Sequence, residues 1–251
     1  MKRAYITILT SDDFEPGVSA LYKRIREYSR EDFCVLVSDD VSSSVKDKLS
    51  LLGAIVVDEK NSCYLSDCLT DIQKNDRWAK TLFKLQVFRN RGYDKLVYLD
   101  SDLLIRASLD DLFEKPSFSA VSDKDFFPQY SRGGLNAGVM VIEPSNSVYE
   151  GLIKEVSKVA ATGKPFGDQD VINSYLDKWD ELTNLHLDVS YNTCFYDSED
   201  VKDPKVVHFI LGNKPWMSNA VVNYLKCLKW YMTRKGLQAK YMLEYLKILR
   251  G

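Results

Sequence analysis

The chain has 251 residues, of which 45% are hydrophobic, and is long enough to bury one sizeable core in a single domain. Its formal net charge of −2 at pH 7 argues against a nucleic acid as the main partner. The five cysteines are odd in number, scattered and without a Cys-x-x-Cys pair, which favours free thiols in a reducing compartment over a disulfide framework or a zinc site.

The first predicted element is an apolar strand at residues 4–10. Lys2 and Arg3 precede it, but Asp12 and Asp13 interrupt the apolar run too soon for a signal peptide. No stretch of the sequence reaches the apolar length of a transmembrane helix. We therefore expect a soluble, cytoplasmic protein.

Strand and helix signals alternate through the first hundred residues. A helical stretch to about Tyr28 follows Gly17, and a later helix begins at a serine-rich turn and ends at Gly53. The other signals are strands at 33–38 and 54–57, the serine turn at 42–44, a helix at 78–89 and a strand that ends at Asp100. Repeated strand–helix–strand units predict a parallel sheet with helices on both faces, and such sheets bind ligands beyond the carboxyl ends of their strands.

The second half of the chain is less regular. Strands are predicted at 119–122 and 137–142 around a loop at 124–135, and helices at 145–161 and 168–177. The sequence contains no repeat and no clear linker, so we expect one α/β domain.

After Pro215 the sequence is helical and basic. Its charged residues are Lys226, Lys229, Arg234, Lys235, Lys240, Lys247 and Arg250, against the single acid Glu244. Such a segment suits contact with an anionic membrane or a partner, or the solvated face of a terminal helical hairpin.

The most informative motif lies at residues 96–104, where Asp100 and Asp102 end an apolar run that predicts a buried strand. Side chains two residues apart share one face of a strand, so both carboxylates can converge on one cation. Hard oxygen donors suit Mg²⁺ or Mn²⁺ bound together with a substrate phosphate. The alternative is a strand end followed by a solvated acidic turn.

A second motif lies at residues 206–216, where an apolar strand carries His208 and a short turn carries Gly212 and Lys214. A histidine in an apolar strand is often a satisfied core residue. If His208 instead faces the cation, it completes a mixed nitrogen and oxygen site with room for a diphosphate. Glycine lets a backbone N–H approach a phosphate closely, and lysine supplies a mobile positive charge.

With these motifs the chain resembles the retaining glycosyltransferases of family 8, and within them the glycogenin and galactinol synthase branch. The resemblance covers essentially the whole chain as an ordered series. The motifs are Leu9-Thr10-Ser11, Lys84, Asp100-Ser101-Asp102, Leu135-Asn136-Ala137-Gly138-Val139, Gly167-Asp168-Gln169 and His208 through Trp216. The resemblance implies an α/β, Rossmann-like GT-A fold with a mostly parallel sheet, a catalytic domain at 1–216 and a helical extension at 217–251 packed on it.

The resemblance also implies a role for each motif residue. Leu9, Thr10 and Phe14 would hold the uridine, with the apolar and aromatic side chains on either side of the base. The metal ligands would be Asp100, Asp102 and His208, with Asp100 also near the ribose, and the diphosphate clamp would be Gly212 and Lys214. The remaining donor-binding positions are Arg77, Lys84, Ser101, Asp123, Asn136, Ala137, Gly138, Asp168 and Gln169, where carboxylates and amides suit sugar hydroxyls.

The implied reaction moves a hexose from a UDP-sugar to a hydroxyl of a glycan, a polyol, a protein or the enzyme itself. UDP-glucose is the first expected donor, before UDP-galactose and UDP-N-acetylglucosamine. Mn²⁺ or Mg²⁺ and Lys214 would stabilise the charge on the leaving diphosphate. We expect the acceptor to enter on the leaving-group face. The alternative double displacement has Asp168 and Gln169 as its nearby nucleophiles, and these two with Lys214 are the expected catalytic residues.

Other features bear on the acceptor and the partners. Lys164-Pro165-Phe166 stands where glycogenins usually carry a further acidic residue. The candidates for a self-glucosylated tyrosine are Tyr191 and Tyr196. The segment between Tyr191 and His208 is shorter than the corresponding segment of glycogenins. Because glycogenin-like members are often dimeric, a homodimer is among the expected partners.

Two other function classes share part of these motifs. Haloacid dehalogenase-type phosphatases also end an apolar strand in Asp-x-Asp. They need a Gly-Asp-x-x-x-Asp motif, however, and Gly167-Asp168-Gln169-Asp170 has a different spacing. The other class is a non-catalytic module that binds a sugar nucleotide or a glycan. Turnover of a UDP-sugar distinguishes a transferase from both.

Overall fold

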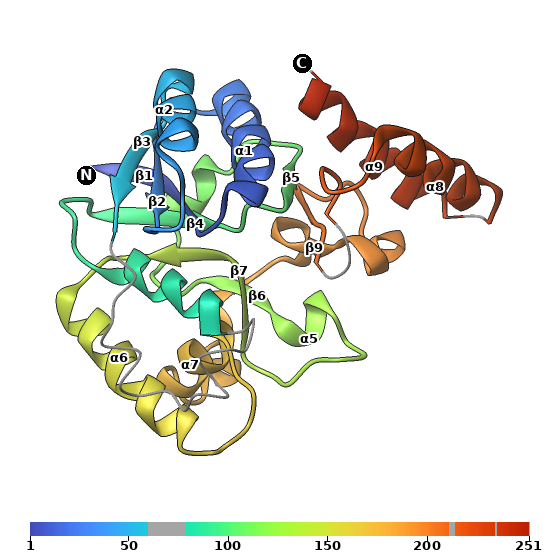
Figure 1. Cartoon of the computed structure of the whole chain (residues 1–251). Coiled ribbons are helices and arrows are strands. Elements are labelled where there is room, and N and C mark those ends of the chain that lie inside the picture. Colours follow the sequence, from blue (N-terminus) through green and yellow to red (C-terminus); the bar gives the residue numbers. More distant parts are fainter. Residues whose placement is uncertain (60–78, 211–213, 234, 251) are drawn as a thin grey trace.

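In the computed structural model, residues 1–59, 79–210, 214–233 and 235–250 are described. A seven-stranded sheet of order β3-β2-β1-β4-β7-β6-β8 forms its centre (Figure 1). The strands of this sheet are β1 (Arg3–Leu9), β2 (Asp32–Val37), β3 (Ile55–Asp58), β4 (Lys95–Leu99), β6 (Ala120–Ser122), β7 (Leu135–Ile142) and β8 (His186–Leu187).

The central sheet is mostly parallel, as expected. β1 pairs in parallel with β2 and with β4, and β2 pairs in parallel with β3. β7 breaks the pattern because it runs antiparallel to both β4 and β6, while β6 and β8 are parallel. The parallel strands β1, β2 and β4 therefore end at one edge of the sheet, where the Asp100 motif begins.

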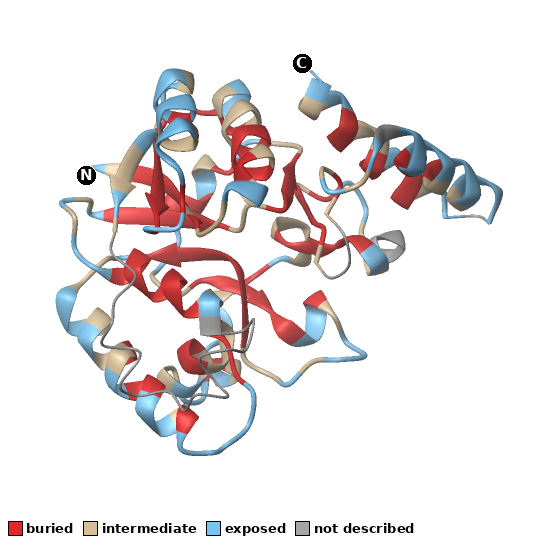
Figure 2. Ribbon diagram, in the orientation of Figure 1, coloured by how far each residue is buried: buried red, intermediate tan, exposed pale blue. Residues whose placement is uncertain are grey.

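Helices cover both faces of this sheet (Figure 1). Side chains alternate along β4, so Val97 and Leu99 face one core and Leu96 and Tyr98 face the other. The first core lies under α1 (Glu15–Tyr28) and α2 (Ser43–Leu52), and the second under α6 (Asn146–Ala160) and α7 (Asp168–Tyr175). Figure 2 shows most of the strands buried between these layers, with the edge strand β3 and the outer faces of the helices more exposed.

Two segments differ from the sequence-based prediction. The helix predicted at 78–89 is a 3₁₀ helix at Ala79–Phe88, and Trp78 lies outside the described residues. Residues 82–88 are all buried, so this segment lacks the solvent-facing side of an ordinary surface helix. The loop predicted at 124–135 begins with the short helix α5 (Asp123–Phe126). The other 3₁₀ helices are Asp12–Phe14, Asp110–Glu114, Trp179–Glu181, Thr183–Leu185, Val189–Tyr191 and Phe195–Asp200.

A second, three-stranded sheet joins distant parts of the chain beside the Asp100 motif. Its strands are β5 (Leu103–Ile105), β10 (Val206–His208) and β9 (Thr193–Cys194), in that order. β5 and β10 are antiparallel, and the register pairs Leu103 with His208. Since β5 directly follows Asp102, this pairing places His208 beside the Asp100–Asp102 motif.

The last two helices, α8 (Ala220–Met232) and α9 (Gly236–Arg250), form a hairpin at one side of the molecule (Figure 1). α9 packs through Tyr241 and Tyr245 into a third core that includes Ala20 of α1 and Leu104 of β5. In the part of the chain that the structure describes, no helix is long and apolar enough to span a membrane.

Candidate active site

Asp100, Asp102 and His208 converge where β4 ends and the small sheet begins. One side-chain ligand atom from each lies within 4.8 Å of the others. His208 Nε2 lies 3.1 Å from Asp102 Oδ1 and 3.8 Å from Asp100 Oδ2. The backbone N–H of Phe209 donates to the Asp102 carbonyl at 3.0 Å, which fixes the two motifs against each other.

The His208 ring is oriented by a buried amide. Asn192 is fully buried, and its Nδ2 donates to Asn136 Oδ1 at 2.7 Å. Its Oδ1 can therefore only accept, and it lies 3.0 Å from His208 Nδ1. Nδ1 therefore carries a proton, and Nε2 is the ring nitrogen that faces the two carboxylates and could bind a cation. Two carboxylates and a free imidazole nitrogen are a donor set that fits Mn²⁺ or Mg²⁺.

Gly138 of β7 leaves the space that the His208 ring occupies. A Cβ at residue 138 would lie 2.6 Å from His208 Cε1 and 2.7 Å from Nδ1. The Gly138 carbonyl also accepts from the Asp100 backbone N–H at 2.9 Å. A glycine in this motif is therefore required by the close approach of the imidazole.

Lys84 connects two carboxylates and one backbone carbonyl from three different parts of the chain. Its Nζ lies 2.6 Å from Asp168 Oδ2 and 3.1 Å from Asp100 Oδ1, and it donates to the Ala137 carbonyl at 3.2 Å. The Tyr98 hydroxyl donates to the same Asp100 Oδ1 at 2.5 Å. Asp100 is thus held by the buried ammonium of Lys84 and the buried phenol of Tyr98.

Burial and neighbouring charges shift the pKa values of Lys84, Asp100 and Asp102 in opposite directions. Burial lowers the pKa of Lys84, but the Asp100 and Asp168 carboxylates outweigh it, so the pKa lies above its ordinary value. Burial raises the pKa of Asp102, and the neighbouring His208 and Lys214 outweigh it and hold that pKa low. Burial raises the pKa of Asp100, and the charge of Lys84 opposes this. Asp102 is therefore the more strongly ionised carboxylate of the two.

A second polar network lies beside the cluster. Asp123 Oδ1 accepts from Gln169 Nε2 at 3.1 Å and from Asn136 Nδ2 at 3.3 Å. Gln169 Oε1 accepts from the Ala137 backbone N–H at 3.1 Å. Through Asn136 this network continues to Asn192 and so to the His208 ring. The sugar-binding and metal-binding positions expected from the sequence form one connected set.

The family model for glycosyl transferase family 8 matches residues 5–220 of the chain. The chain belongs to glycosyltransferase family 8. Among its relatives, glycogenin-1 of Caenorhabditis elegans is 33% identical over 237 residues, which cover 89% of this chain and 53% of the relative. Mouse glycogenin-1 is 28% identical over 230 residues, which cover 85% of this chain and 65% of the relative.

Relatives in family 8 with other names also match. Inositol phosphorylceramide glucuronosyltransferase 1 of Arabidopsis thaliana is 36% identical over 176 residues, which cover 69% of this chain and 30% of the relative. The chain thus spans between about a third and two thirds of the length of these relatives.

Solved structures agree with the fold. The galactosyltransferase LgtC, solved with donor and acceptor sugar analogues, aligns with a TM-score of 0.71 at 14% identity. The alignment covers 98% of this chain and 95% of LgtC. The α/β fold with its mostly parallel sheet and helical C-terminal region is therefore that of the GT-A glycosyltransferases.

The uridine-loop residues expected in a family 8 enzyme lie at the end of β1. The Leu9 side chain is 1% exposed and belongs to the core, so it presents no face on which a base could stack, contrary to the expectation from the sequence. Thr10 and Phe14 are partly exposed. The Phe14 ring meets the Trp216 ring edge-on at 6.0 Å, and Trp216 Nε1 donates to the Asp13 carbonyl at 2.8 Å. The loop that follows β1 is therefore in contact with Trp216, the last residue of the His208–Trp216 motif.

Two further expected site residues that the structure describes, Lys214 and Ser101, lie near this junction. Lys214 Nζ donates to Asp102 Oδ2 at 2.6 Å and to the Phe209 carbonyl at 2.9 Å, so its charge lies at the metal-ligand cluster. The Ser101 carbonyl lies beside Gly17, where a Cβ would come within 2.7 Å of it. Arg77 and Gly212 lie outside the described residues.

The structure adds positioning residues that the sequence analysis did not name. Tyr98 could have been found, because it lies two positions before Asp100 and so shares its face of the strand. Thr81 Oγ1 accepts from the Asp168 backbone N–H at 3.0 Å, at the start of α7. Neither Thr81 nor Asn192 carries a sequence signal, because only tertiary packing brings them to the site.

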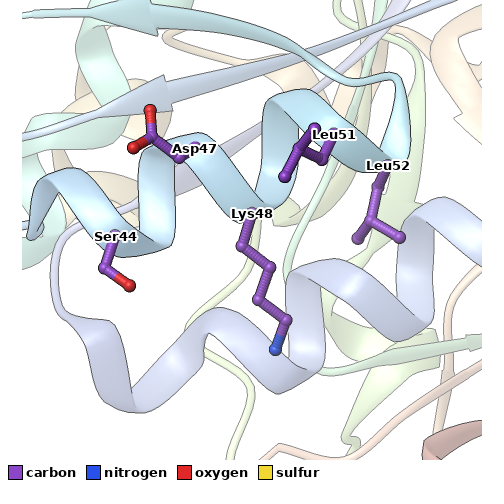
Figure 3. Close-up of a pocket in the computed structure, with 5 residues that line it drawn as sticks. All are labelled: Ser44, Asp47, Lys48, Leu51 and Leu52. Atoms are coloured by element: carbon purple, nitrogen blue, oxygen red, sulfur yellow. The ribbon is translucent and has the colours of Figure 1, made fainter.

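A surface depression elsewhere on the molecule is lined by none of the expected site residues. It lies along α2 and is lined by Ser44, Asp47, Lys48, Leu51 and Leu52 (Figure 3). Lys48 reaches Glu15 of α1, with Nζ 2.7 Å from Oε2. We therefore place the candidate active site at the Asp100 cluster and not at this depression.

Proposed function

We propose that this family 8 glycosyltransferase transfers a hexose from a UDP-sugar to a hydroxyl acceptor, with retention of the anomeric configuration. The observation that carries the proposal is the convergence of Asp100, Asp102 and His208. These residues would hold Mn²⁺ or Mg²⁺, and a cation bound there would supply positive charge for the leaving diphosphate.

The positions of the other charged groups support the same reaction. The bond from the anomeric carbon to the diphosphate oxygen breaks, and negative charge develops on the nucleoside diphosphate. Lys214, which now contacts Asp102, would stabilise that charge most in the transition state. Lys84 holds Asp168 and Asp100 in place beside the sugar.

Hydrogen bonding in the site favours attack on the leaving-group face. Gln169 uses Oε1 for the Ala137 N–H and Nε2 for Asp123, so its carbonyl oxygen is already engaged. Asp168 is paired with Lys84, which reduces its nucleophilicity. The acceptor oxygen would form the new bond to the anomeric carbon, and its proton would pass to a diphosphate oxygen.

The donor we propose is UDP-glucose. Asp123, Asp168, Gln169 and Asn136 offer carboxylates and amides to the sugar, which suit uncharged hydroxyls. A glucuronate carboxylate would instead meet two acidic side chains, and Lys84 is already paired with two carboxylates. UDP-galactose and UDP-N-acetylglucosamine follow in order.

The test is release of UDP from UDP-glucose, UDP-galactose, UDP-N-acetylglucosamine and UDP-glucuronate, each with Mn²⁺, Mg²⁺ or EDTA. We expect release from UDP-glucose with a divalent cation and none with EDTA. Release that survives EDTA would refute the metal site, and release from UDP-glucuronate alone would refute the donor. Binding of UDP without turnover of any donor would point to a non-catalytic binding module.

The acceptor can be tested in the same reactions. We propose a hydroxyl on a glycan, a polyol, a protein or the chain itself. For self-transfer Tyr196 is the better-placed candidate, since it is exposed, whereas the Tyr191 hydroxyl is bound to Asp111 and Lys205. Intact mass after incubation with UDP-glucose and Mn²⁺ would show hexose increments if self-transfer occurs, and Tyr196→Phe would remove them.

The proposed compartment is a reducing one. Cys34, Cys194 and Cys227 are free and buried in the structure, which supports the cytoplasmic setting expected from the sequence.

A further inference from the structure

The helix α8 exposes a continuous apolar face. Val221, Leu225, Leu228 and Met232 follow one another at intervals of four, three and four residues, which places them within a sector of about 60° on one side of the helix. Each of these four side chains is between 57 and 75% exposed. We call these four residues the outer stripe. Figure 2 shows the hairpin that carries it at the edge of the molecule.

The opposite face of α8 is fixed to the rest of the protein. Asn223 and Cys227 are buried, and Asn223 Nδ2 donates to the Pro215 carbonyl at 2.7 Å. The Trp230 ring meets the Phe195 ring edge-on at 5.5 Å. These contacts fix the rotation of α8 about its own axis, so the outer stripe faces away from the rest of the protein. An exposed apolar face of this kind marks an interaction surface.

Basic and aromatic side chains border the outer stripe. Lys229, which is exposed, and Lys226 lie along one side of α8, and Tyr224 and Tyr231 lie along the other. The Arg250 guanidinium lies over the Tyr224 ring, 5.0 Å from its centroid. Apolar residues flanked by lysine, arginine and tyrosine are typical of helices that lie in a membrane interface.

Positive charge is concentrated in this part of the chain. Residues 217–251 contain seven of the 34 basic residues and one of the 36 acidic residues, a net charge of +6. Since the whole chain carries −2, residues 1–216 carry −8. Two copies that met through their outer stripes would bring two such basic segments together, which charge repulsion opposes. An anionic surface satisfies both the apolar stripe and the positive charge.

We propose that α8 docks this protein on an anionic lipid bilayer. The helix lies parallel to the membrane, the outer stripe enters the boundary between headgroups and acyl chains, and Lys226, Lys229 and Arg250 contact lipid phosphates. With 13 residues α8 is too short to cross the bilayer, so it meets the membrane from the side. This surface is independent of the proposed glycosyl transfer.

The test is co-sedimentation of the full chain with vesicles of phosphatidylcholine, with and without phosphatidylglycerol. We expect binding to the anionic vesicles alone, weakened by salt. Leu225→Glu should reduce it at least tenfold. Leu51→Glu, at a position of α2 that is 89% exposed, should leave it unchanged. Lys226→Gln with Lys229→Gln should weaken binding about fivefold per lysine, whereas Lys154→Gln with Lys164→Gln, at exposed positions elsewhere, should not.

Three results would overturn the proposal. One is no binding to anionic vesicles, and another is equal loss of binding in Leu225→Glu and Leu51→Glu. The third is a lipid-free dimer, seen by sedimentation velocity, that Leu225→Glu converts to monomer, because this would assign the outer stripe to a second copy of the chain. Thermal unfolding of each variant verifies that it is folded, and no arm of the test depends on UDP-sugar turnover.

Discussion

Asn192 is not among the residues expected to bind the metal or the donor, yet its contact with Nδ1 determines which nitrogen of His208 faces the proposed cation. Replacing it by alanine leaves His208 Nδ1 without its partner and frees the ring to rotate or change tautomer. We expect Asn192→Ala to weaken Mn²⁺ binding 10- to 100-fold, the range found when partners of metal-ligating histidines are removed. Calorimetric titration with Mn²⁺ measures this, and Asn184→Ala at an exposed position is the control. Equal affinities would show that His208 is held by packing alone.

Asp102 is the carboxylate closest to both His208 and Lys214. Asp102→Asn keeps the shape of the side chain and removes its charge, so the fold should persist. We expect UDP-sugar turnover with Mn²⁺ to fall at least 100-fold, whereas the exposed Asp125→Asn should retain full activity. Initial rates of UDP release measure the effect. Turnover at the normal rate in Asp102→Asn would place the cation elsewhere.

At the level of elements, the strand β7 limits what can stand beside His208. A methyl group at residue 138 would overlap the imidazole, so either the ring or the strand must move. We expect Gly138→Ala to lower the free energy of unfolding by about 1–3 kcal/mol and to weaken Mn²⁺ binding together with it. Gly236→Ala is the matched control, because nothing lies within 4 Å of its Cβ position. Urea denaturation gives the first quantity, and a Gly138→Ala protein of unchanged stability would contradict the prediction.

Local patterns predicted the elements and the parallel sheet, but not the antiparallel strand pairs. The cap at Ser42, the helix end at Gly53 and the apolar run of β4 are local signals, and each appears in the structure. The antiparallel β4–β7 pair and the β5–β10–β9 sheet depend on contacts between distant residues, which periodicity does not encode. For the same reason both motifs of the candidate metal site could be predicted from the sequence, but Asn192 could not. Asn192 lies next to His208 because β9, which directly follows it, pairs with β10.

At the level of the whole molecule, Lys84 connects the layers around the sheet. It extends from the buried 3₁₀ helix to Asp100 after β4 and to Asp168 at the start of α7. We expect Lys84→Met to lower the free energy of unfolding by about 3–5 kcal/mol, because it leaves the buried Asp168 and the partly buried Asp100 without their cation. Denaturant titration measures this loss.

A second substitution separates the charge effect from lost packing. Adding Asp168→Asn to Lys84→Met removes one of the two carboxylate charges left unpaired by the loss of Lys84, and should recover part of the stability. Asp170→Asn added instead, at a more exposed carboxylate of the same helix, should recover none. If both double variants behave alike, Lys84 acts through its aliphatic stem and not through its charge.

The β5–β10 pairing has a consequence for how such a protein can change over generations. His208 opposes Leu103 in a ladder only three residues long, and a slip of one residue would present Val207 where the imidazole now stands. The ladder tolerates no insertion. The exposed part of the connection between β9 and β10, which includes Tyr196 and Lys202, has no such constraint, since both ends of the connection are held by the same small sheet. Insertions and deletions in that connection can reshape the surface next to the reaction centre while His208 keeps its position. Acceptor preference could diverge there with the donor chemistry unaltered.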